Sequence, residues 1–127
     1  MKDLNESQKY VHPSQIKDIK GGARFQNSDT LFARITPCLQ NGKICQVKGL
    51  NNSLGFGSTE FLVFRGKEEI SNTDLVYYLS RYDVVRKFAE QNMIVYTLST
   101  HSYLNPHFFK ILLNPFLKFN GLFKMRF

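Results

Sequence analysis

The chain has 127 residues, which is enough for one domain with a hydrophobic core and too few for two. Hydrophobic residues make up 43% and charged residues 21%, which excludes a disordered chain, and no apolar run approaches the roughly 20 residues of a membrane span, so we expect a soluble, cytoplasmic protein. Seventeen Lys and Arg against ten Asp and Glu leave a formal charge of +7, which is typical of a small domain that binds a polyanion; a merely basic soluble protein is the alternative.

The first half of the chain predicts one helical turn followed by a β-hairpin. Residues 12–19, "HPSQIKDI", contain a Pro and a Ser that favour the start of a short helix. Residues 29–36, "DTLFARIT", alternate as a strand, and Pro37 ends it because proline cannot donate to a ladder. The Asn-Gly pair in "QNGK" and the returning strand "KICQVKGL" complete the pattern, so residues 30–48 are predicted to form a hairpin.

The stretch "GFGSTEFLVF", residues 55–64, joins two glycines to an apolar run without a break. In this stretch Thr59, Phe61 and Val63 share one face and Leu62 and Phe64 the other, and both faces are apolar, which predicts a central strand that is covered on both sides. We expect Gly55 and Gly57 to let the backbone bend beside this strand, where a side chain would collide.

A helical pattern follows the strand. Ser71 and Asp74 resemble a capping box. The apolar face is predicted from residues that follow at helical spacing, namely Leu75, Leu79, Tyr82 and Val85. Asp83 is a possible start for a second helix through "VVRKFAEQNM", and the pattern fits two short helices joined near Tyr82 as well as one long helix.

The end of the chain has a different composition. After Glu90 no acidic residue occurs, and six of the twelve phenylalanines fall in the last twenty residues. We therefore divide the chain into a core, residues 1–93, and a divergent, Phe-rich segment of the same domain, residues 94–127. A Phe- and Lys-rich tail of this kind also fits a membrane-surface binder, which we rank below the other hypotheses.

The pattern of reactive residues gives little support to catalysis. No histidine lies at metal-ligand spacing with a cysteine, and no phosphate-binding loop occurs, so neither a metal site nor a cofactor is predicted. Cys38 and Cys45 are expected to be buried free thiols. Glu60, within the predicted central strand, is the one unusual carboxylate, and we expect a structural hydrogen bond to neighbouring backbone rather than a catalytic base.

Basic and amide side chains gather at predicted turns and strand ends. Lys and Arg at such places can reach DNA phosphates, and Asn and Gln can read base edges. The alternative is that turns are simply polar. The candidate DNA-binding residues are Arg24, Arg34, Gln40, Asn41, Lys43, Lys48, Asn51, Asn52, Arg65 and Lys67.

Four separated motifs carry a family resemblance: "GGARF", "DTLFARITPCLQNGK", "GFGSTEFLVFR" and "YYLSRYDVVRKFAEQNM". In this order and at these gaps they resemble the target recognition domain of type I restriction-modification specificity subunits, over roughly residues 10–93. The resemblance implies a single α/β (α+β) domain, with a central sheet and short helices, that reads one half of a split double-stranded DNA target. It also implies a non-enzymatic role, in which the subunit directs methyltransferase and endonuclease subunits to the site. Residues of these motifs that it implies to be scaffold are Gly22, Asp29, Pro37, Gly42, Gly55, Gly57, Ser58 and Glu60.

The resemblance weakens after Met93. The family pattern continues there with a Gly/Ser/Thr-rich turn, an apolar closing strand and a long helix, whereas this chain has "IVYTLSTHSYLNPHFFK" and only a distorted version of the closing strand. No long spacer helix is predicted in residues 94–127. We therefore expect a chain truncated after one domain, either a half-length subunit or a fragment, with subunit binding in doubt. A remnant or protein-interaction module without DNA affinity is the alternative.

Overall fold

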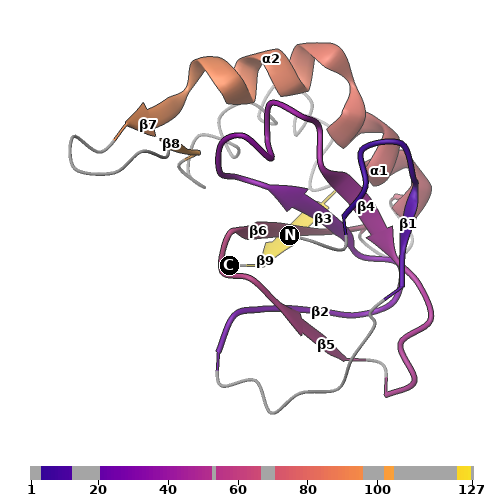
Figure 1. Ribbon diagram of the computed structural model, residues 1–127. Coiled ribbons are helices and arrows are strands. Elements are labelled where there is room, and N and C mark those ends of the chain that lie inside the picture. The colour runs from indigo at the N-terminus through magenta and orange to yellow at the C-terminus, as the bar shows by residue number, and fades with distance from the viewer. Residues whose placement is uncertain are drawn as a thin grey trace.

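The computed structural model of the protein describes residues 4–12, 21–52, 54–66, 71–95, 102–104 and 123–126. These residues form a five-stranded sheet, a separate two-stranded ribbon, a small hairpin and two helices (Figure 1). The predicted fold class, a single small α+β domain with a central sheet and short helices, is confirmed. The predicted helical turn at residues 12–19 lies almost entirely outside the described residues.

The five-stranded sheet combines strands from both ends of the chain. Its order is β1 (Tyr10–Val11), β4 (Ile44–Val47), β3 (Thr30–Ala33), β6 (Phe61–Gly66) and β9 (Phe123–Arg126). β1 is parallel to β4, and the other neighbouring pairs are antiparallel. The ribbon pairs β2 (Ala23–Phe25) with β5 (Gly55–Gly57), and the small hairpin pairs β7 (Met93–Val95) with β8 (Ser102–Leu104). Residues 94–127 thus supply an edge strand to the main sheet.

The predicted hairpin is confirmed, but its connection differs from the prediction. β3 and β4 pair antiparallel with Phe32 opposite Ile44, yet β3 ends at Ala33 rather than at residue 36. The Asn-Gly pair does not make a tight two-residue turn. Residues 34–43 form a longer loop instead, because the chain coils inward there to bury Leu39, which is only 2% exposed.

The main sheet is covered on both faces. β6 was predicted to be such a strand, and its alternate side chains do enter two different cores. The core between sheet and helices, here called the helix-side core, contains Phe32, Leu39, Ile44, Leu62, Phe64, Val76, Tyr77, Val85 and Ala89. The core between sheet and ribbon, the ribbon-side core, contains Leu4, Val11, Phe25, Leu31, Cys45, Val47, Phe61 and Val63. Figure 1 shows the resulting three layers, with the helices above the sheet and the ribbon below it.

The two glycines of "GFGSTEFLVF" belong to a strand rather than to a bend, but the expected collision with a side chain at these positions is confirmed. Gly55 lies opposite Phe25 in the ribbon. A Cβ atom on Gly55 would overlap the ring of Phe25, and one on Gly57 would lie 2.9 Å from the same ring. Because both positions lack a side chain, the Phe25 ring can cover β5 and still reach the ribbon-side core. After β5 the chain turns and enters β6 in the neighbouring sheet.

Gly22 shows a second close approach within the ribbon. Its φ of +105° is a conformation that residues with a side chain rarely adopt, and a Cβ atom there would overlap the carbonyl oxygen of Gly57. The motifs "GGARF" and "GFG" are therefore two halves of one structure. Gly22 of the first motif has no room for a side chain because it lies against the Gly57 backbone. Gly57 of the second has none because it lies against the Phe25 ring.

Two helices pack above the sheet: α1 (Thr73–Arg81) and α2 (Asp83–Gln91). This settles the choice between one long helix and two short ones, because Tyr82 between them has extended backbone. The predicted cap is wrong by one residue. Asn72, not Ser71, is the N-cap of α1, since its side-chain oxygen accepts a 2.7 Å hydrogen bond from the backbone N–H of Asp74.

The predicted apolar face is wrong at Leu75 and Tyr82, while Leu79 is half-buried and Val85 is buried. Leu75 and Tyr82 are exposed, at 43% and 57%, whereas Val76 and Tyr77 are buried in the helix-side core. The reason is that α1 carries apolar residues on both sides, so helical spacing alone does not identify the side that meets the sheet. The turn at Tyr82 then redirects the chain so that Val85 of α2 reaches the same core, as predicted.

Candidate nucleic-acid interface

The candidate DNA-binding residues fall mainly at the two opposite ends of the main sheet. Loop 34–43 follows β3, and loop 48–52 follows β4, which runs in the opposite direction. A four-residue strand is about 13 Å long, so the two loops cannot contribute to one small pocket. Arg34, Gln40, Asn41 and Lys43 lie at the first end, and Lys48, Asn51, Asn52 and Arg65 lie at the second.

Loop 34–43 is stabilised from within. Its backbone forms turn-like hydrogen bonds, including Leu39 N–H to Ile35 O at 2.9 Å and Lys43 N–H to Cys38 O at 3.0 Å. α2 adds a contact from outside, because Arg86 donates a 3.0 Å hydrogen bond to the carbonyl oxygen of Gln40. The side chains of Gln40 and its neighbour Asn41 are exposed. Loop 34–43 therefore exposes two amide side chains on a backbone that is anchored in the helix-side core by Leu39.

Two other residues at this end neutralise each other. The guanidinium Nε of Arg34 lies 3.6 Å from Oε2 of Glu60, and both side chains are about three-quarters buried. Glu60 lies just before β6, and the expected hydrogen bond of its carboxylate to neighbouring backbone is replaced by this ion pair. Glu60 compensates the charge of Arg34, so Arg34 is less available to contact a phosphate.

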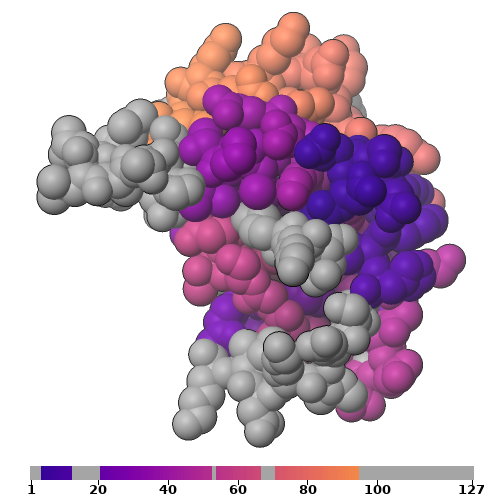
Figure 2. Space-filling view, viewed as in Figure 1, coloured from indigo at the N-terminus to yellow at the C-terminus, as the bar shows by residue number. Residues whose placement is uncertain are grey.

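Loop 48–52 presents its polar side chains to solvent. Lys48, Asn51 and Asn52 are exposed. The Lys48 ammonium lies 4.8 Å from the ring centroid of Tyr10, which is itself 41% exposed, so the cation rests on an aromatic face at the edge strand β1. In Figures 1 and 2 the chain between β4 and β5 bulges outward at the right-hand edge of the molecule.

A neighbouring turn holds this loop in place. The Asn27 side chain accepts a 3.0 Å hydrogen bond from Leu50 N–H and donates a 3.1 Å bond to Leu50 O. Lys48 N–H donates to Val11 O at 3.0 Å, which ties the start of the loop to β1. The Leu50 side chain packs against the ribbon-side core. Asn27 was not predicted from the sequence, although the polar run "QNSD" is typical of a turn.

A buried ion pair supports the turn that contains Asn27. Arg65 donates two 2.6 Å hydrogen bonds to the carboxylate of Asp29, which is buried. The same carboxylate accepts a 2.8 Å bond from Gln26 N–H. Asp29 raises the pKa of the Arg65 guanidinium, chiefly through these hydrogen bonds. Asp29 thus lies in the scaffold, and the candidate DNA-binding Arg65 is engaged inside the protein.

The remaining candidate cations lie away from both loops or outside the description. Arg24 is exposed on the outer face of the ribbon, with its guanidinium carbon 5.6 Å from the ring centroid of Phe56. Lys43 is half-buried at the end of loop 34–43. Lys67 lies outside the described residues. Of the predicted cations, the described ones without an ion pair are therefore Arg24, Lys43 and Lys48.

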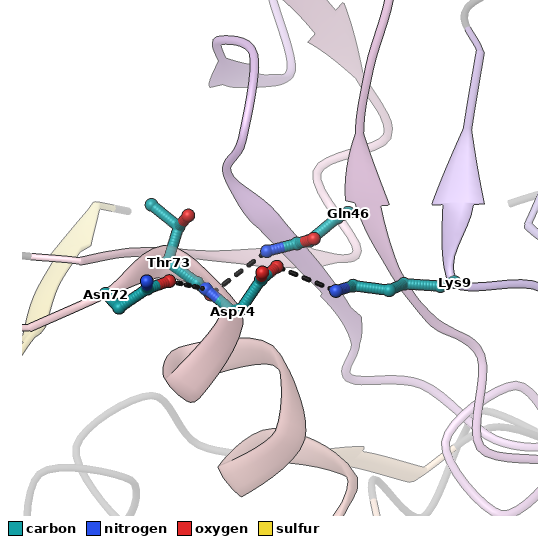
Figure 3. Close-up of polar contacts among 5 residues, drawn as sticks. All are labelled: Lys9, Gln46, Asn72, Thr73 and Asp74. Atoms are coloured by element: carbon teal, nitrogen blue, oxygen red, sulfur yellow. Dashed lines mark hydrogen bonds and ion pairs between the residues drawn. The ribbon is translucent and has the colours of Figure 1, made fainter.

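A polar network fixes α1 beside the edge strand and was not predicted (Figure 3). Lys9 Nζ lies 2.7 Å from the Asp74 carboxylate, and Gln46 of β4 donates a 3.0 Å bond to the Thr73 carbonyl oxygen. The hydrogen bond with Asp74 raises the pKa of Lys9 and lowers that of Asp74. Lys9 also lies 4.8 Å from the ring centroid of Tyr78. This network connects the helix layer to the strand that carries Tyr10.

The described residues contain no group of three or more His, Cys, Asp or Glu that could hold a metal ion. Cys45 is buried, and burial raises the pKa of its thiol, which lies 3.4 Å from Asn5 O and 3.3 Å from Gln8 O. Cys38 is only partly buried, because it lies in loop 34–43 rather than in a strand, so the expectation for this thiol is wrong. In the part of the chain that the structure describes, no helix has the length and apolar character to cross a membrane.

Two curated proteins are similar to a part of this chain. The specificity subunit of the type I restriction enzyme EcoAI from Escherichia coli is 44% identical over 57 residues, which are 44% of this chain. The specificity subunit of the type I restriction enzyme EcoEI, also from Escherichia coli, is 44% identical over 59 residues, or 43% of the chain. The chain spans about a tenth of the length of these relatives. No protein-family model and no solved structure matches the chain.

Proposed function

We propose that the protein recognises a DNA sequence as part of a type I restriction-modification specificity subunit. It reads one half of a split target and directs methyltransferase and endonuclease subunits to that site, without catalysing a reaction itself. The observation that carries this proposal is the 44% identity, over 57 residues, to a specificity subunit. The formal charge of +7 agrees with it, because a polyanion is attracted to such a surface.

The described residues offer two kinds of contact that this function requires. Arg24, Lys43 and Lys48 are cations without an internal ion pair, and they are suited to phosphates, which set affinity and register but carry no sequence. The exposed amides of loops 34–43 and 48–52 are suited to base edges, because a carboxamide can donate to and accept from an adenine in the major groove. Catalysis belongs to the partner subunits in this proposal.

Titration of a labelled DNA duplex at several salt concentrations tests the proposal. Contacts to about four phosphates should give a slope of about −3.6 in a plot of log affinity against log salt. Lys48→Ala should make the slope shallower by about 0.9, because one phosphate contact is lost. Lys87→Ala on the exposed side of α2 is the matched control and should leave the slope unchanged. Absence of binding at low salt, or a flat salt response, would favour a protein-interaction module without DNA affinity.

A further inference from the structure

Loop 48–52 combines exposed polar side chains with a backbone that is held at several points. Asn27 closes a reciprocal pair of hydrogen bonds with both backbone groups of Leu50, at 3.0 and 3.1 Å. This amide replaces the strand partner that the loop backbone lacks. The Lys48 N–H is bonded to Val11 O on the preceding side, and the Leu50 side chain is partly buried beneath. The positions on either side of these anchors, including Asn51 and Asn52, remain exposed.

The anchor is itself connected to the core through a series of contacts. Asn27 lies in a turn where Gln26 N–H donates to the Asp29 carboxylate, and Ser28 N–H donates to Val47 O at 2.8 Å. Arg65 of β6 fixes that carboxylate with two hydrogen bonds. A displacement of the loop would therefore have to break contacts that lead directly to two strands of the main sheet. These contacts hold the loop backbone in place, although the loop lies at the surface.

A loop backbone that is held in this way matters more for reading bases than for contacting phosphates. A carboxamide discriminates adenine only when both its donor and its acceptor align with the base edge. A phosphate contact by a lysine tolerates a range of positions, because the ammonium is a point charge on a flexible stem. Ordering a free loop on binding also costs free energy, which a loop that is ordered beforehand avoids.

We infer that residues 48–52 form the base-reading loop for duplex DNA and that Asn27 is the residue that positions it. This inference rests on the proposed function and assigns the reading of bases to one loop. Asn51 and Asn52 enter the groove and meet base edges, Lys48 meets a backbone phosphate beside Tyr10, and Asn27 touches no DNA. Loss of Asn27 then removes sequence discrimination and leaves attraction to DNA intact.

The test is selection from a random duplex library, followed by titration of the enriched duplex and a scrambled duplex of the same composition. The full chain should enrich a motif. Asn27→Ala should reduce the ratio of enriched to scrambled affinity at least tenfold, while affinity for the scrambled duplex and its salt slope stay within twofold. Asn27→Asp keeps the acceptor for Leu50 N–H and should retain an intermediate ratio.

Asn72→Ala is the matched control, because it removes an asparagine hydrogen bond that caps α1 far along the chain from the loop. It should lower the melting temperature and leave the affinity ratio unchanged. An enriched motif whose ratio survives Asn27→Ala overturns the positioning role while the proposed function stands. The positioning role is also overturned, and the proposed function stands, if Asn27→Ala weakens binding to both duplexes equally, as a general loss of folding would. No enrichment by the unmodified chain overturns the proposed function itself and, with it, this inference.

Discussion

Loops 34–43 and 48–52 carry similar polar side chains but owe their shape to different sources. Loop 34–43 buries one of its own residues, Leu39, and forms hydrogen bonds within itself. Loop 48–52 is held by a side chain from another turn, Asn27, which bonds backbone atoms and not side chains. A surface loop can thus be held in place either by one of its own side chains buried in the core or by hydrogen bonds from another turn to its backbone. In both loops the exposed amide side chains make no hydrogen bond among the described residues.

The ion pairs at the two ends differ in the same sense. Asp29 and Arg65 beneath the second loop form two 2.6 Å hydrogen bonds around a buried carboxylate. Arg34 and Glu60 near the first loop are 3.6 Å apart and about a quarter exposed. The ion pair beneath loop 48–52 is therefore the stronger of the two.

The largest expected effect comes from breaking that support. Asp29→Ala leaves the Arg65 guanidinium without its partner and should lower the free energy of unfolding by about 3–5 kcal/mol. Glu60→Ala should cost less, because the 3.6 Å contact of its carboxylate with Arg34 is too long for a hydrogen bond. Urea denaturation of both variants measures the difference. Equal losses would show that the two ends are supported alike.

The next effect concerns the core residue of the first loop. Leu39→Ala should cost about 2–5 kcal/mol, because it opens a cavity in the helix-side core. Leu50→Ala in the second loop should cost less, since that side chain is only partly buried. Thermal and urea denaturation give both values. A greater loss for Leu50→Ala would mean that the second loop, too, depends on its own side chain.

A smaller effect is expected at the edge strand. Tyr10→Leu removes the aromatic face beneath the Lys48 ammonium and should weaken duplex binding about two- to fivefold, equivalent to about 0.5–1 kcal/mol. The salt slope should not change, because the charge is kept. Tyr82→Leu at the exposed junction between α1 and α2 serves as the control and should bind as the unmodified chain does. A change in slope for Tyr10→Leu would contradict this view of the pair.

The smallest effect is the pH dependence of the Lys9–Asp74 pair. The pKa of Asp74 is lowered below its ordinary value of 3.8, so its contribution to stability is present above that value and is lost as the pH falls through the folded-state pKa. The difference in melting temperature between the unmodified chain and Asp74→Asn should therefore shrink as the pH falls below about 4. A difference that stays constant down to pH 2 would exclude the ion pair as its source.

The strands of the main sheet that are rich in apolar residues were predicted from the sequence. β6 was predicted because a strand that is buried on both faces reads as a continuous apolar run, and the β3–β4 hairpin because residues 29–36 alternate and an Asn-Gly pair follows them. β5 was missed because its three residues include two glycines, and their role appears only when Phe25 is paired opposite them. The face of α1 was wrong because both of its sides are apolar.

The candidate site was predictable only as a set of residue types near turns. Lys48, Asn51 and Asn52 were named, and they do lie together on one exposed loop. Sequence reasoning did not separate the engaged Arg65 from the unpaired Lys48, because the partner of Arg65 is 36 positions away. It also missed Asn27, whose hydrogen bonds reach across 23 positions. Contacts between distant turns leave no periodic trace in a sequence.

The grip of Asn27 on backbone atoms has a consequence for how the protein could change over generations. Among the described residues, the side chains of Asn51 and Asn52 make no hydrogen bond and no ion pair, and both are exposed. Substitutions at such positions usually alter stability by less than about 0.5 kcal/mol. Mutation can therefore explore new chemistry at positions 51 and 52 while folding is preserved. A lineage could acquire a new preference there in single steps, without passing through an unfolded ancestor.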